Sequence, residues 1–316
     1  MLPYLFLVPA FFCRGQQAII YSQNAFNKAG VNPAASGIEM TQKINFVFGV
    51  DRRWIGFKHS PKTNFVNFSL TIRPPRAYHY WQNLGAYVDN QESGLSSNSG
   101  VYFTYAFHLL LRKNVVASFG FNAGLRTYFI DASLLDKSDP VIQKTDFRTL
   151  VYPDIIPGFR FTTKKFYLDV AARQLTTPAL QDFRGHKIGS PSKLNPTLFF
   201  SAGRLVSLNE RWLLLPSLTL TLPFVHFPNV ELNTMLYYDT RMGFGVALRN
   251  LNFVTAIYQL KVIKNVTVGL AYSVSVNSMF YAAPNSFELM IGVPPYGMNT
   301  RPQGKISVSR CPTLDY

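Results

Sequence analysis

The sequence predicts an all-β protein, a transmembrane antiparallel β-barrel of roughly 14 strands. Apolar and polar residues alternate in short segments from residue 43 to residue 291, and a period of two is typical of a strand with one apolar face. Several segments keep the alternation for about 9 to 11 residues, which is enough to cross a bilayer, whereas strands of soluble sandwiches have mostly about 5 to 6. No apolar stretch is long enough for a membrane-spanning helix.

The expected strands follow one another along the chain. The clearest is Asn114 to Phe129, where apolar residues at most odd positions face serine, glycine and asparagine at even ones. The same reading predicts strands at 43–51, 64–72, 84–90, 99–108, 114–129, 155–161, 166–173, 197–206, 212–222, 230–238, 242–249, 253–260, 266–276 and 287–293. Pro157 and Pro216 fall inside two of them, where the missing N–H predicts a bulge or a misplaced strand.

Connections between these strands alternate in length. Short ones are expected at 109–113, 162–165, 207–211 and 239–241, and long ones at 52–63, 91–98, 130–154 and 174–196. Outer-membrane barrels have short periplasmic turns and longer extracellular loops, so this pattern predicts that topology with both chain ends in the periplasm. The connection 73–83 departs from the pattern because it is longer than a tight turn.

Segments outside the expected barrel, 43–293, complete the domain organisation. Residues 1–15 are expected to be a signal peptide, because an apolar run too short to span ends in small residues; an N-terminal strand is the alternative. Its removal leaves Cys311 as the one cysteine, which excludes an intrachain disulfide and a multi-cysteine zinc site. Turn formers dominate 16–42, expected to be a periplasmic segment or folded into the barrel mouth, and 294–316 is expected to be a periplasmic tail.

Composition and the placement of charge indicate which kinds of partner the chain contacts. The chain is 15% charged, below the quarter typical of soluble domains, and 15% aromatic, as interfacial girdles require. Its net charge of +15 is spread over turns and strand ends. That placement favours contact with outer-membrane lipid or an acidic partner over nucleic acid, which would need a concentrated basic surface with interleaved aromatics.

No catalytic, cofactor-binding or metal-binding constellation is predicted. The five histidines are isolated, without metal-ligand spacing, and no Gly-x-Ser-x-Gly elbow occurs. A hydrolase using a serine with His108 on the barrel wall remains an alternative, although no orienting partner for it can be named.

Ordered motifs resemble one known family. The stretch Tyr21 to Asn27 precedes Val31-Asn32-Pro33-Ala34, Arg53-Trp54 follows the first strand, and Ser286 to Gly292 forms the last. Together with a terminal Cys311-Pro312, this order is similar to the PorP/SprF family of outer-membrane proteins associated with type IX secretion and gliding. The resemblance implies a non-enzymatic barrel that helps export or surface attachment of large secreted proteins such as adhesins. It also implies as partners a client with a C-terminal sorting domain and periplasmic or lipoprotein secretion components.

Five residues are candidate partner or client contacts. Asn32 and Pro33 form either a turn before the first strand or a periplasmic docking surface. Arg53 and Trp54 form an interfacial anchor beside the first long loop or a partner contact. Glu288 alternates with apolar neighbours, so it is expected to face the lumen.

The competing function is an outer-membrane channel or transporter for small or hydrophobic solutes. Presumed inward positions of two strands are small, which leaves room for a plug or passenger segment as readily as for water; they are Gly243, Gly245, Ala247, Gly269, Ala271 and Ser273.

Overall fold

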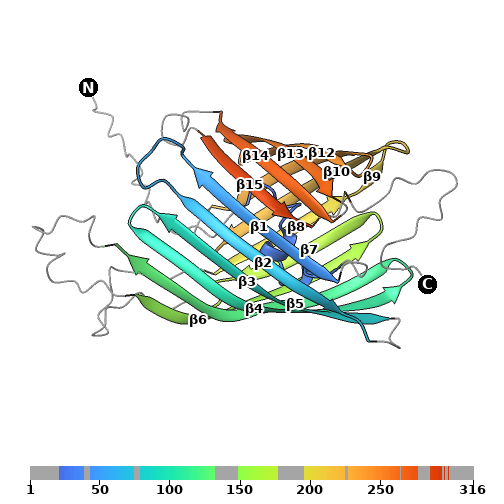
Figure 1. Ribbon diagram of the computed structural model, residues 1–316, viewed down its shortest axis with the longest axis horizontal. Coiled ribbons are helices and arrows are strands. Elements are labelled where there is room, and N and C mark those ends of the chain that lie inside the picture. The colour runs from blue at the N-terminus through green and yellow to red at the C-terminus, as the bar shows by residue number, and fades with distance from the viewer. Residues whose placement is uncertain are drawn as a thin grey trace, which may run out of the picture.

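A computed structural model of the protein shows a closed antiparallel β-barrel of 14 strands (Figure 1). The structure describes residues 21–38, 43–74, 79–131, 149–176, 196–224, 227–263, 265–276 and 285–293, together with Pro295 and Met298. The predicted fold class and strand number are therefore confirmed. Within these ranges no helix has the length and apolar character needed to cross a membrane.

Strand bounds are as follows. The elements are β1 (Ile44–Arg53), β2 (Lys62–Ile72), β3 (Tyr80–Ser93), β4 (Ser96–Arg112), β5 (Val115–Ile130), β6 (Leu150–Thr163), β7 (Phe166–Arg173), β8 (Thr197–Arg204), β9 (Val206–Ser207), β10 (Trp212–Pro223), β11 (Asn229–Tyr238), β12 (Met242–Arg249), β13 (Phe253–Ile263), β14 (Val266–Ser275) and β15 (Asn285–Gly292). Neighbours in sequence pair in order, β9 continues β8 along β10, and β15 pairs with β1 to close the barrel.

Alternation along the strands separates an apolar exterior from a polar interior. On β5, Phe119 is 60% exposed, whereas its neighbours Ser118 and Gly120 are buried. On β4, Val101 is also 60% exposed. In a soluble sandwich such side chains would form the core; here they form the belt that faces lipid, while polar side chains fill the lumen.

One predicted long loop is wrong. Segment 91–98 is the paired end of β3 and β4, joined by the two-residue turn Gly94-Leu95, where Gly94 has a φ of 59°. These strands extend beyond the apolar belt, so both of their faces are polar and the alternation stops while the backbone pairing continues. Most of the connections 130–154 and 174–196 lies outside the described residues.

Beside each of the two prolines within strands, Pro157 and Pro216, one ladder of strand pairing ends or breaks, but the register of the strands does not change. Pro157 lies in an unbroken β5–β6 ladder, but the β6–β7 ladder ends at Gly158 opposite Ala171. Pro216 lies beside the break between β8 and β9, and the pairing on both sides keeps one register. The expected bulges are therefore absent at these prolines: a missing N–H removes a ladder bond but inserts no residue.

The N-terminal segment lies inside the barrel. Residues 21–38, called the plug below, contain the short helix α1 (Lys28–Val31) and the 3-10 helix η1 (Pro33–Ala35). In Figure 1 this blue segment lies within the ring of strands. Tyr21 and Ala34 are fully buried. The segment was expected either in the periplasm or in the mouth of the barrel. Its described part, residues 21–38, lies inside the barrel, in the lumen.

Candidate functional site

Two asparagines shape the plug. The side chain of Asn27 accepts a hydrogen bond from Gly30 N–H at 3.1 Å at the start of α1. Asn32 does the same for Ala34 N–H at 3.0 Å, and Pro33 occupies the first position of η1, where its missing N–H costs nothing. Asn32-Pro33 is therefore a helix start buried in the lumen, and the first strand begins only later, at Ile44.

Glu288 on β15 holds the beginning of the plug. Its carboxylate accepts backbone N–H groups of Ser22 at 2.7 Å and Gln23 at 3.1 Å, and its side chain is 2% exposed. Beside it, Arg249 forms an ion pair with Glu231 at 2.8 Å, and the same guanidinium donates to Ser22 Oγ. Glu288 faces the lumen, as the alternation predicts.

Asp169 on β7 holds the middle of the plug. Its carboxylate accepts from Asn32 Nδ2 at 3.1 Å and from Arg160 Nη1 at 2.8 Å, and lies 3.9 Å from Lys28 Nζ. Arg173, further along β7, donates to the carbonyl of Gly30. Burial, followed by the charge of Arg160, lowers the pKa of Lys28 well below its ordinary value, and Asp169 opposes that shift.

A third anchor holds the end of the plug. Trp81 Nε1–H donates to Gly37 O at 2.9 Å, and His108 Nε2 lies 2.9 Å from Ser36 O. Since a carbonyl only accepts, Nε2 carries the hydrogen, and Nδ1 accepts from Ser118 Oγ at 2.8 Å in the neutral ring. Ser118 and His108 do form a pair, but both are fully buried and the histidine is occupied by the plug.

Wall glycines leave room for the plug backbone. A Cβ at Gly120 would lie 2.5 Å from Ala34 N, and one at Gly158 would collide with the Asn32 side chain. Of the small inward residues noted in the sequence, Gly269 faces Gln23 and Phe26 of the plug. Gly243 and Gly245 instead face wall side chains, Tyr237 and Met235, so side chains fill the space beside them.

Arg53 and Trp54 lie at the rim, away from the buried pair Asn32 and Pro33. Arg53 Nε donates to Asp51 at 2.8 Å, whereas Trp54 is 38% exposed and its backbone N–H donates to Asn285 O at 2.7 Å. The five candidate residues therefore lie in three places. Asn32 and Pro33 belong to the plug, Glu288 anchors it, and Arg53 and Trp54 lie at the rim.

Sequence reasoning missed most anchors. Asp169 lies between Leu168 and Val170, which is the same signal that singled out Glu288. A buried network around Arg126 was also missed: its guanidinium donates to Asp89 at 2.9 Å, and Tyr102 OH donates to Asp154 at 2.8 Å. Within the described ranges no group of three or more potential metal ligands occurs.

Solved structures show the same fold class. The toluene transporter TbuX of Ralstonia pickettii is 10% identical, with a TM-score of 0.53 over 85% of this chain and 93% of that chain. The Pseudomonas putida toluene transporter TodX is 11% identical, with a TM-score of 0.48 over 84% and 92%. At these identities the likeness shows the fold alone. A search among curated proteins found no match.

The family comparison covers most of the chain. Residues 13–293 match the family described as type IX secretion system membrane protein PorP/SprF. This family and the closed barrel are of a secretion or channel kind rather than an enzymatic kind, and they place the protein in the outer membrane as a multi-strand barrel. The chain therefore belongs to the PorP/SprF family of type IX secretion system membrane proteins.

Proposed function

We propose that this barrel is a non-enzymatic accessory of type IX secretion that helps large secreted proteins, such as adhesins, to leave the cell or attach to its surface. Family membership supports the secretion role. The observation that carries the proposal is the plug: residues 21–38 occupy the lumen and are held through Glu288, Asp169 and His108. A general porin needs a water-filled lumen instead.

The two barrel ends suit different partners. The long-loop end would face outward and meet a client with a C-terminal sorting domain, and the short-turn end would meet periplasmic or lipoprotein components. Trp54, Ile55 and Phe57 lie exposed in the connection between β1 and β2. This connection is ordered by hydrogen bonds from Trp54 N to Asn285 O and from Gly94 N to His59 O. An ordered apolar rim of this kind suits a protein contact.

Deletion tests the proposal. Without the barrel, we expect one or a few large surface proteins to disappear from the cell exterior while small-solute uptake is unchanged. Replacing Arg53 and Trp54 together by alanine should lower surface display of the client, while heat-modifiable gel migration still reports a folded barrel. The chain offers a matched control in Arg211-Trp212, an Arg-Trp pair at the opposite end, whose replacement should leave client display intact.

A solute channel is the second candidate. It is supported by the fold likeness to TbuX and by the early end of the β6–β7 ladder, beyond which β6 continues from Leu150 to Pro157 without β7 pairing. An apolar solute would cross the wall beside this interruption, where Thr176 Oγ1, just after β7, donates to Pro153 O of β6 at 2.7 Å. Normal surface display in the deletion strain, together with loss of hydrocarbon uptake or of bilayer conductance, would favour this function instead.

A further inference from the structure

Five cationic residues lie side by side at the short-turn end of the barrel. Arg112 and Lys113 lie where β4 passes into β5, Lys164 and Lys165 connect β6 to β7, and Arg204 ends β8. These five residues are called the basic arc below. Strands β4 to β8 are consecutive neighbours in the sheet, so at about 4.8 Å between strands the basic arc spans about 20 Å of the rim.

Strand pairing fixes this order along the rim. Val115 of β5 pairs with Arg112 on one side and with Thr163 of β6 on the other. Across the next turn, Phe166 N–H donates to Thr163 Oγ1 at 3.0 Å, and Phe166 pairs with Arg204. The two turns and the end of β8 are therefore adjacent.

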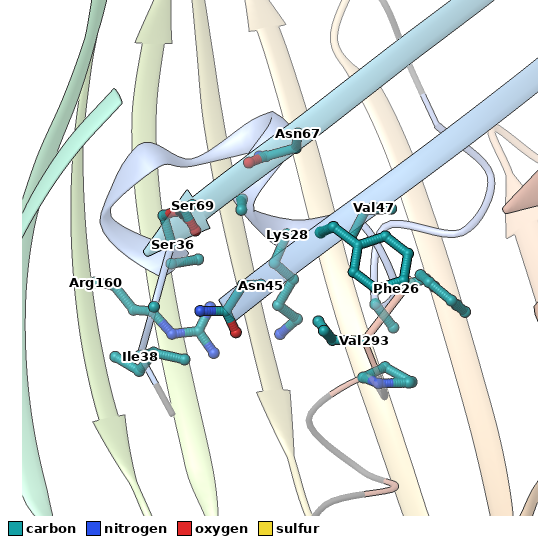
Figure 2. Close-up of a pocket in the computed structure, with 16 residues that line it drawn as sticks. Phe26, Lys28, Ser36, Ile38, Asn45, Val47, Asn67, Ser69, Arg160 and Val293 are labelled. Carbon is teal, nitrogen blue, oxygen red and sulfur yellow. Dashed lines mark hydrogen bonds between the residues drawn. The ribbon is translucent and has the colours of Figure 1, made fainter. Parts of the chain in front are cut away.

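The charge of the basic arc is not neutralised within the described part of the chain. Four of the side chains are exposed and that of Lys164 is half-buried. Their charged groups have no hydrogen bond or ion pair with another described residue. The connecting stretches 109–115, 162–166 and 203–206 contain no Asp or Glu. By contrast, Arg160, which Figure 2 shows beside the plug, pairs with Asp169 at 2.8 Å.

The wall next to the basic arc is apolar and faces lipid. Leu111, beside Arg112, is 52% exposed, and Phe166 is 38% exposed. The rings of Phe161 and Phe166 are 5.9 Å apart, and Arg204 lies on the outward face because it is the cross-strand partner of Phe166. The cations therefore begin where the lipid-facing apolar surface ends, which is the depth of the headgroups in a bilayer.

We propose that the basic arc binds anionic phospholipid, with phosphate groups beside the cations and acyl chains along Leu111, Phe161 and Phe166. The inference goes beyond the secretion role and does not depend on it. Basic residues close to a membrane surface attract anionic lipid, and aromatic side chains contact lipid at the same depth. An acidic protein would match the charge, but it would not require the apolar wall directly beside it.

Quenching of tryptophan fluorescence by brominated lipid tests the proposal. Phe166→Trp, in a full chain with Trp54→Phe and Trp212→Phe, places a reporter beside the basic arc, and the remaining Trp81 is buried in the lumen. The chain is reconstituted in vesicles of phosphatidylglycerol and phosphatidylcholine, with either lipid brominated. We expect phosphatidylglycerol to bind about fivefold more strongly, or about 1 kcal/mol, the attraction of one cation at a membrane surface. Added salt should lower this preference.

A pair of substitutions assigns the preference to the basic arc. Lys165→Gln together with Arg204→Gln should lower it below about twofold, because two of the cations beside the reporter are removed. Lys58→Gln together with Lys62→Gln is the matched control. Both control residues are exposed cations at the opposite end, so their replacement should leave the preference unchanged.

Equal binding of the two lipids in the reporter protein would overturn the proposal, as would a preference that Lys165→Gln with Arg204→Gln leaves unchanged. Polyglutamate distinguishes a protein partner. If it binds the detergent-solubilised chain through Lys165 and Arg204 while the two lipids bind equally, the basic arc recognises an acidic protein instead. If Phe166→Trp does not give a heat-modifiable barrel, native Trp212 at the same end serves as reporter in the Trp54→Phe chain.

Discussion

Replacing Gly120 by alanine should release the plug from the lumen. The added Cβ would lie 2.5 Å from Ala34 N, 2.6 Å from the Pro33 carbonyl carbon and 2.8 Å from Ala34 Cα. All three atoms belong to the plug backbone, so no change of rotamer relieves the overlap. Either the plug or β5 must move by about 1 Å to reach an ordinary carbon contact.

The size of the effect follows from the cost of overpacking. An extra methyl group in a well-packed interior costs about 1–3 kcal/mol. The overlap exists only while the plug is seated, so the cost falls on that state alone. The population with a released plug should rise by about 5- to 150-fold, at about 1.4 kcal/mol for each factor of ten.

Thiol labelling measures the population of molecules with a released plug. In a background without Cys13 and Cys311, a cysteine replacing Ser36, which is 1% exposed, should react with a maleimide in proportion to plug release. Single-channel recordings should show more frequent opening in the same proteins. Gly245→Ala is the matched control, because its Cβ meets the flexible side chain of Met235 and no plug atom. Equal labelling rates in the wild type, Gly120→Ala and Gly245→Ala would refute the view that the wall glycine seats the plug.

Three further perturbations address the anchors. Glu288→Gln replaces an accepting carboxylate oxygen by a donating NH2 group beside two backbone N–H groups. The free energy of plug release should therefore fall by about 1.5–3 kcal/mol, so the cysteine at position 36 should label faster. Exposed Glu92→Gln should leave the labelling rate unchanged. Asp169→Asn removes the carboxylate that pairs with buried Arg160 and should lower the free energy of unfolding in urea by about 3–5 kcal/mol. Asp239→Asn, in an exposed pair, should cost under about 1 kcal/mol. The pKa of Lys28 is lowered in the seated plug by burial and by its neighbouring arginine, against the carboxylate of Asp169. The released lysine therefore binds more protons between that lowered pKa and about 10.4, so seating should strengthen as pH rises through this window, and Lys28→Met should abolish that slope in labelling.

The barrel itself could be predicted because its signal is local. Alternation along each strand reports which face meets lipid, and each of the 14 expected strands has a counterpart in the structure. The errors lie where that signal ends. At 91–98 both faces of the hairpin meet water, so backbone pairing continues without any pattern in the side chains. The bulges predicted at Pro157 and Pro216 are also absent. The sequence shows that each proline lacks an N–H group, but not which neighbouring strand loses the hydrogen bond.

The contents of the lumen were decided only by the tertiary structure. Turn-forming residues in the segment before β1 indicate that it forms neither a long helix nor a strand. They do not indicate where in the fold the segment lies. Its partners, Glu288, Asp169, His108 and Gly120, are dispersed over strands β4 to β15 and meet only when β15 pairs with β1. A charge in an apolar strand can be read as lumen-facing from sequence alone, as Glu288 was. That it holds the backbone of Ser22 and Gln23 follows from closure of the barrel, because contacts between residues more than 260 positions apart depend on the whole ring of strands.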